Sequence, residues 1–155
     1  VNSINSIAEK YQVPVIYSTH PRTRKFIEKR KIVFHSLVQN VKPLGFLDYV
    51  KLQANALLVL SDSGTLTEES AILGFPGVLI RTSTERPEGL DAGTIVVGGI
   101  KSRDVLSAAE LAIKISKESS ISKLPIDYET TDVSTKVVKV IQSYIHIVNK
   151  TTWQK

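Results

Sequence analysis

The segment that follows the apolar run 56–60 carries residue types that can bind phosphate. A Ser63-Gly64-Thr65 turn leads from this run directly into a predicted helix. Gly64 allows a ligand to approach the backbone closely, and the first amides of a helix lack internal hydrogen-bond partners. Together with the hydroxyls of Ser63 and Thr65, these amides form a site suited to a phosphate. Thr65 and Glu68 also fit a capping box, which would satisfy the helix start without a ligand.

A second carboxylate, Glu69, follows in the first turns of the same predicted helix. It can complement the positive end of the helix dipole, which needs no ligand. It can also accept two hydrogen bonds from a vicinal diol, such as the one in the ribose of a nucleotide. The residues alone leave both interpretations open.

Arg86 lies between Glu85 and Pro87 in a second polar loop, at positions 81–88. It can belong to a surface cluster of ion pairs, which would contribute little to stability. Alternatively, a guanidinium near a helix N-terminus can neutralise the charge of a diphosphate. The two polar loops together favour an anion site.

Two further side chains lie near the predicted ligand edge. His20 ends one strand and precedes a helix, and Tyr49 is either a core aromatic or lies against a base. His35 and His146 are distant in sequence from His20, so no metal site is expected. The chain has neither a Gly-x-x-x-x-Gly-Lys loop nor a Gly-x-Gly-x-x-Gly fingerprint, and no cofactor is predicted.

Apolar spacing and turn residues predict the elements that position these side chains. Helices are expected near 4–11, 21–30, 46–53, 65–73, 102–116 and 133–148, and strands near 13–17, 38–41, 56–60, 77–80 and 94–97. Short apolar strands that alternate with helices indicate a Rossmann-like α/β domain, with a parallel sheet covered by helices on both faces. In such sheets, ligands bind beyond the carboxyl ends of the strands.

Composition limits the classes of protein further. The 155 residues suit one domain (1–155), with a net charge of +5 and no cysteine. The longest aliphatic run has five residues, whereas a membrane-spanning helix needs roughly 18–20. No signal peptide opens the chain, so a cytoplasmic location is expected. A start at Val1 without any Met indicates a fragment.

Most of the excess positive charge is local. The segment 20–31 holds six Lys and Arg side chains and one Glu. It is either a solvated helix face or a basic rim that attracts an anionic small ligand. Nucleic acid is not expected to be the partner, because only Phe26 interleaves with the cations.

Five short motifs occur in order between about positions 43 and 99. They are Asp62-Ser63-Gly64, Glu68-Glu69, Leu73-Gly74-Phe75-Pro76, Thr84-Glu85-Arg86-Pro87-Glu88 and Ala92-Gly93-Thr94. This set resembles the C-terminal half of the non-hydrolysing UDP-N-acetylglucosamine 2-epimerase family. The resemblance implies one lobe of a two-lobed glycosyltransferase-B-type fold, with a UDP-sugar held between the lobes.

The resemblance also implies roles for residues in the two polar loops. Ser63 and the amides of Gly64 and Thr65 would hold the diphosphate. Arg86 would face the same phosphates, and Glu69 would bind the ribose hydroxyls.

Tyr49 would lie near the uracil, and His20 would match a histidine associated with a second, activating sugar nucleotide. The chain departs from many relatives in having Thr65 instead of a second Gly. It also has Arg22 where relatives have an Asn two residues after His20, and it lacks a Gly-Asp-Gly before the last helix. The latter two departures resemble the subgroup that makes UDP-N-acetyl-L-fucosamine, and they leave regulation by a second UDP-sugar open.

By the same resemblance, UDP is eliminated from the sugar and added back on the other face of C2. The carboxylates for this chemistry belong to the N-terminal lobe of the family, which is absent here. The fragment is therefore expected to bind UDP without turnover. The full-length enzyme is expected to be a homodimer that supplies precursors of surface polysaccharides. The alternatives are a glycosyltransferase lobe of the same fold and a non-catalytic UDP-sugar-binding module.

Overall fold

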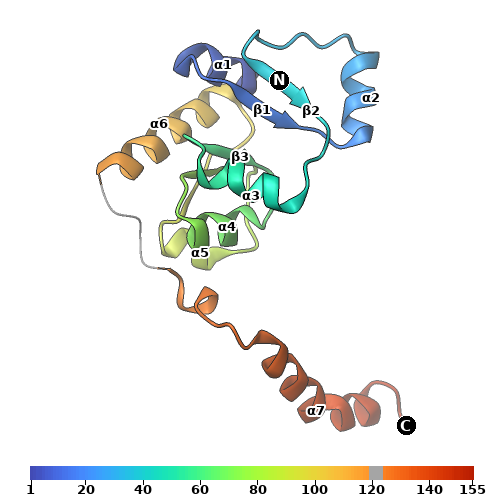
Figure 1. The fold of residues 1–155 in the computed structure, drawn as a ribbon. Coiled ribbons are helices and arrows are strands. Elements are labelled where there is room, and N and C mark those ends of the chain that lie inside the picture. The colour runs from blue at the N-terminus through green and yellow to red at the C-terminus, as the bar shows by residue number, and fades with distance from the viewer. Residues whose placement is uncertain (119–123) are drawn as a thin grey trace. The chain divides into compact units, whose positions relative to one another are not determined.

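The computed structural model describes residues 1–118 and 124–155, in two units, Val1–Pro125 and Ile126–Lys155. In the first unit, helices alternate with strands, as the sequence predicts (Figure 1). Its elements are α1 (Asn2–Tyr11), β1 (Val15–Ser18), α2 (Pro21–Lys29), β2 (Val38–Val41), α3 (Phe46–Ala54), β3 (Val59–Ser61), α4 (Leu66–Leu73), β4 (Gly77–Leu79), α5 (Pro87–Asp91), β5 (Ile95–Val97) and α6 (Ser102–Glu118).

The strands form two parallel sheets, where the sequence predicted one. The first pairs β1 with β2, with Val15 opposite Val38. The second has the order β3-β4-β5, with Leu60, Val78 and Val96 in register. The α/β class with parallel strands is confirmed.

Helices cover both faces of the β3-β4-β5 sheet, because alternate side chains of a strand point to opposite faces. One face forms a core with α4 and its C-terminal loop, comprising Val59, Leu66, Phe75, Leu79, Ile95 and Val97. The other face forms a core with α6, comprising Leu58, Leu60, Val78, Val96, Ala108 and Ala112. The helix α1 packs against α6.

The helix α4 is fixed at its C-terminal end by two local features. It stops at Gly74, whose φ of 74° is left-handed and whose N–H donates to the carbonyl of Ser70, as expected for a glycine cap. The buried hydroxyl of Ser70 contacts the carbonyls of Phe75 and Thr94, at 2.7 Å and 2.9 Å. These bonds tie α4 to the start of β5.

The second unit contains a short 3₁₀ helix (Ile126–Tyr128) and the helix α7 (Val133–Thr151). The predicted last helix is confirmed, although it extends to Thr151. Near the start of α7, Lys136 lies 3.8 Å from the carboxylate of Asp132. Residues 119–123, within the polar stretch 117–131 of the sequence, lie outside the described residues. Within the described ranges, no helix combines the length and the apolar character that crossing a bilayer requires.

Candidate functional site

The candidate residues follow the carboxyl ends of three strands. His20 comes after β1, Ser63 after β3 and Arg86 after β4. Burial and then the negative charge of Asp62 raise the pKa of Tyr17. Because Tyr17 lies in β1 and Asp62 directly follows β3, this interaction indicates that the ends of the two sheets lie near each other.

Arg86 lies over the turn that precedes α4. Its Nε donates to the carboxylate of Glu68 in the first turn of α4. A Cβ atom at position 64 would come within 2.5 Å of Nη1 of Arg86. Gly64 therefore leaves the space that the guanidinium occupies, and Glu68 binds the guanidinium through its Nε. Nη1 also lies 3.8 Å from the more exposed carboxylate of Glu85.

The capping box that the sequence allowed does not form. Thr65 is the N-cap of α4, but its side chain makes no capping hydrogen bond. Its hydroxyl instead lies 2.9 Å from that of Ser63. Glu68, the other half of the predicted box, is drawn to Arg86.

The start of α4 consequently keeps open donors. Within the described part of the chain, the amides of Gly64 and Thr65 make no hydrogen bond. They stand at the positive end of the helix dipole, beside two hydroxyls and a guanidinium. This arrangement can bind an anion with at least two oxygen atoms to share among the donors.

Glu69 faces α3 from the next position of α4. Its Oε2 accepts a hydrogen bond of 2.5 Å from Nε2 of Gln53, a residue that is only 2% exposed. Burial and then the charge of Glu69 raise the pKa of Tyr49, one turn before Gln53. Phe46, the first residue of α3, is 77% exposed.

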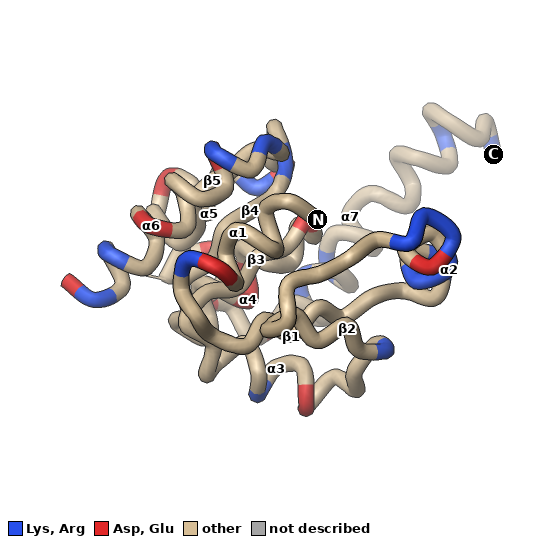
Figure 2. Tube along the Cα trace, turned by 90° about the horizontal axis from the view of Figure 1, so that it is seen from above, with Lys and Arg blue, Asp and Glu red and all other residues tan. Residues whose placement is uncertain are grey.

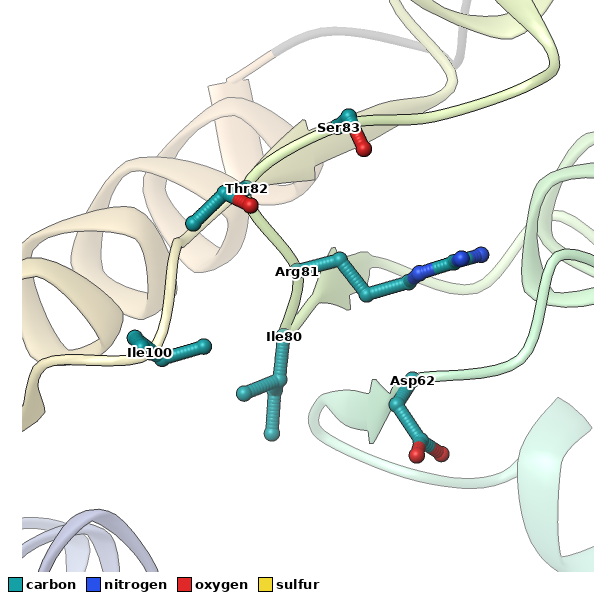
Figure 3. A pocket seen from close by; sticks show the side chains of 6 residues that line it. All are labelled: Asp62, Ile80, Arg81, Thr82, Ser83 and Ile100. Atoms are coloured by element: carbon teal, nitrogen blue, oxygen red, sulfur yellow. The ribbon is translucent and has the colours of Figure 1, made fainter.

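A hollow of about 500 Å³ lies beside these loops, at the carboxyl ends of β3 and β4 (Figure 3). It is lined by Asp62, Ile80, Arg81, Thr82, Ser83 and Ile100. Arg81 extends from the end of β4 and pairs with Glu85 at 3.2 Å. The hollow thus carries charges of both signs, with Asp62 directly before the turn that leads into α4.

His20 occupies a different place from the other candidates. It caps α2, with its Nδ1 accepting from the backbone of Arg22 at 3.3 Å. Figure 2 shows the Lys and Arg residues that gather on α2 and just beyond it. No residue of α2 is buried. Among the described residues, no hydrogen bond or ion pair joins His20 to the other six candidates.

The structure thus brings together Gly64 and Arg86, Ser63 and Thr65, and Tyr49 and Glu69. Sequence reasoning missed the pairings of Glu68 with Arg86 and of Gln53 with Glu69. The spacing of Tyr49 and Gln53, one helical turn apart, was the available signal for the second. In the parts of the chain that the structure describes, no group of three metal-binding side chains is found.

Comparisons with known proteins agree on one family. A family model described as UDP-N-acetylglucosamine 2-epimerase matches residues 1–142. A UDP-N-acetylglucosamine 2-epimerase of Methanococcus maripaludis is 36% identical over 121 residues. That match covers 76% of this chain and 33% of the relative, so the chain spans about a third of its length.

Two solved structures match the fold. The UDP-N-acetylglucosamine 2-epimerase from Rickettsia bellii has a TM-score of 0.82 at 38% identity, over 99% of this chain and 43% of that one. The Methanocaldococcus jannaschii UDP-GlcNAc 2-epimerase, in complex with UDP-GlcNAc and UDP, has a TM-score of 0.78 at 28% identity. It is matched over 91% of this chain and 39% of its own.

Proposed function

The chain belongs to the UDP-N-acetylglucosamine 2-epimerase family, and from this membership we propose that it is the UDP-binding, C-terminal lobe of a UDP-N-acetylhexosamine 2-epimerase. One observation carries the proposal. The Arg86 guanidinium is held over Gly64, at a helix start whose first amides are open. A related epimerase crystallised with UDP-GlcNAc and UDP supports the class of ligand.

In this proposal, the diphosphate lies at the N-terminus of α4. The amides of Gly64 and Thr65 donate to its oxygens, with the hydroxyl of Ser63 beside them. Arg86 adds a charge-assisted hydrogen bond through its Nη groups, since Glu68 already engages Nε. Bound in this way, the diphosphate spans the turn between β3 and α4.

The nucleoside extends from the diphosphate toward α3. Glu69 accepts hydrogen bonds from the two ribose hydroxyls, and Tyr49 lies near the uracil. Support comes from the interaction that raises the pKa of Tyr49 through the charge of Glu69, because it requires the two side chains to be near each other. His20 stands apart from this set; by the family resemblance it would match a histidine associated with a second, activating sugar nucleotide.

The proposed reaction inverts C2 in two steps. In the first, the bond from C1 to the diphosphate oxygen breaks and C2 loses its proton, giving a 2-acetamidoglycal and UDP. In the second, UDP adds back to C1 and a proton adds to the opposite face of C2. Arg86 and the start of α4 stabilise the negative charge that develops on the diphosphate.

The acid and base that move the C2 proton belong to an upstream lobe in this proposal, so residues 1–155 alone do not turn over substrate. The substrate is the UDP-GlcNAc/UDP-ManNAc pair or the 6-deoxy-L-talose/L-fucose pair, the second of which matches the sequence departures near His20 and before α7. The product enters surface polysaccharide synthesis in the cytoplasm, from a homodimeric full-length enzyme.

Thermal unfolding of the chain with and without UDP tests the binding site. UDP should raise the melting temperature, because a ligand that binds only the folded state stabilises it. Arg86→Ala and Glu69→Ala should each reduce this increase. Arg103→Ala is the matched control, since the Arg103 side chain is 88% exposed and lies on α6. An increase that neither Arg86→Ala nor Glu69→Ala changes would refute the site.

Product analysis on the full-length protein tests the reaction. An epimerase converts one UDP-sugar into its C2 isomer without an acceptor, whereas a glycosyltransferase requires one. UDP binding without any altered sugar would instead indicate a non-catalytic binding module.

A further inference from the structure

Gln53 is nearly inaccessible to solvent, yet it carries a polar amide. Its exposed fraction is 2%, and its Oε1 is buried without a hydrogen-bond partner among the described residues. A buried, unpaired amide oxygen destabilises a fold, and an apolar side chain of the same length would avoid that loss. Any favourable contribution of the amide therefore comes from its nitrogen, Nε2.

The other end of the amide holds Glu69. Nε2 of Gln53 donates to Oε2 of Glu69 at 2.5 Å, joining α3 to α4. Glu69 is partly exposed, and its Oε1 makes no hydrogen bond within the described ranges. One oxygen of the carboxylate is thus anchored, while the other remains available to a ligand.

We propose that Gln53 is a positioning residue that orients Glu69 toward the ribose diol of the bound nucleotide. This inference rests on the proposed function, in which Glu69 accepts the ribose hydroxyls. A carboxylate with one fixed oxygen presents the free lone pairs of both oxygens in a single orientation. Without the amide, Glu69 would rotate among several conformers and lose part of its affinity for the diol.

The test compares UDP with its 2′,3′-dideoxy analogue, which lacks both ribose hydroxyls. Titration calorimetry on the full-length protein gives the ratio of the two dissociation constants. Gln53→Met keeps the length and burial of the side chain but removes the donor. It should weaken UDP binding about tenfold and leave binding of the analogue nearly unchanged. Gln39→Met, at an exposed position of β2, is the matched control and should change neither constant.

Gln53→Glu keeps the proposal testable if the apolar variant unfolds. At neutral pH the new carboxylate repels Glu69 and should abolish the preference for UDP. At lower pH the two carboxyls share a proton, which restores a donor, so the preference should return. Two results would overturn the inference. One is a ratio of the dissociation constants of UDP and the analogue that stays at the wild-type value in Gln53→Met and Gln53→Glu. The other is an equal loss of affinity for both nucleotides.

Glu69→Gln separates this inference from the function on which it rests. If the wild-type protein does not prefer UDP to the analogue, the ribose role of Glu69 itself is wrong. If Glu69→Gln removes the preference but the Gln53 variants retain it, the proposed function stands and the role of Gln53 is refuted.

Discussion

At the scale of single residues, Gly64 and Arg86 depend on each other for space. Gly64 has no left-handed backbone that would explain its identity, since its φ is not in the positive range. The presence of glycine at position 64 is explained by Arg86, because Nη1 of its guanidinium would lie 2.5 Å from an added Cβ. The long Arg86 side chain can move away from such an atom, so the cost falls on the site and not on the fold.

Gly64→Ala should therefore weaken UDP binding by about tenfold, or about 1.4 kcal/mol, while leaving the free energy of unfolding nearly unchanged. Titration calorimetry and urea denaturation measure the two quantities. Gly45→Ala is the control, because a Cβ there would meet Oδ2 of Asp48 only at an ordinary 3.7 Å. Unchanged UDP affinity in Gly64→Ala would show that the position of Arg86 is unimportant for binding.

A second residue-scale prediction concerns the pKa of Tyr49. Burial and, second, the charge of Glu69 raise this pKa above 10.0. Glu69→Gln should lower it toward 10.0 without reaching that value, because burial persists. NMR titration of the tyrosine rings, with Tyr49→Phe to assign the signal, measures the change. An unchanged pKa would mean that Tyr49 and Glu69 do not face each other.

The sign of the stability effect follows from the raised pKa. A phenol whose folded-state pKa exceeds its unfolded-state pKa contributes stability that is complete below the unfolded value. That contribution is lost as pH rises through the folded-state pKa. Tyr49→Phe should accordingly lose less stability than wild type as the pH rises above 10.0.

At the scale of elements, α5 approaches α4 so closely at Gly89 that a larger residue there would force a side chain of α4 to shift. A Cβ at Gly89 would lie 1.9 Å from Cγ2 of Thr67, a fully buried side chain. The hydroxyl and the amide of Thr94 both donate to the carbonyl of Gly89, which holds α5 from the side of β5. Since α5 begins directly after Arg86, this packing fixes the backbone position from which the Arg86 side chain extends.

Gly89→Ala should destabilise the fold by about 1–3 kcal/mol, as overpacked cores do. Urea denaturation gives the free energy, and Thr67→Ser provides a partner variant that lacks Cγ2. The double variant should recover part of the loss, because the clashing methyl group is gone. Additive losses in the double variant would contradict a direct contact between the two positions.

The elements were predictable from sequence to the extent that their signals are local. Apolar spacing and Gly74 gave α4 nearly to the residue, because helix periodicity and glycine caps act within one turn. The helix α5 was missed, since its five residues hold too few turns to show a period. The division into two sheets was missed as well, because hydrogen bonding between strands depends on long-range packing.

The same distinction applies to the site. The polar residues at strand ends were predictable, because each follows an apolar run in the sequence. The partners were not, since Glu68 meets Arg86 and Gln53 meets Glu69 only when separate elements pack. The capping box at Thr65 does not form for this reason. Glu68, which the local pattern would place in the box, pairs instead with Arg86.

At the scale of the whole molecule, the proposal gives nucleotide binding to this chain and the acid-base chemistry to an upstream lobe. Residues 1–142 match the family model, while the match to the Methanococcus relative covers a third of that protein. The anion site at α4 explains how this part would hold the nucleotide. In this proposal the acid and base for C2 belong to the upstream lobe, so turnover is measured on the full-length protein.

A crystal structure of the full-length protein with UDP tests the central claim most directly. We expect the diphosphate to contact the amides of Gly64 and Thr65 and the guanidinium of Arg86. We also expect the ribose hydroxyls to lie against Glu69. A UDP molecule bound elsewhere, with the start of α4 free of phosphate, would contradict the account.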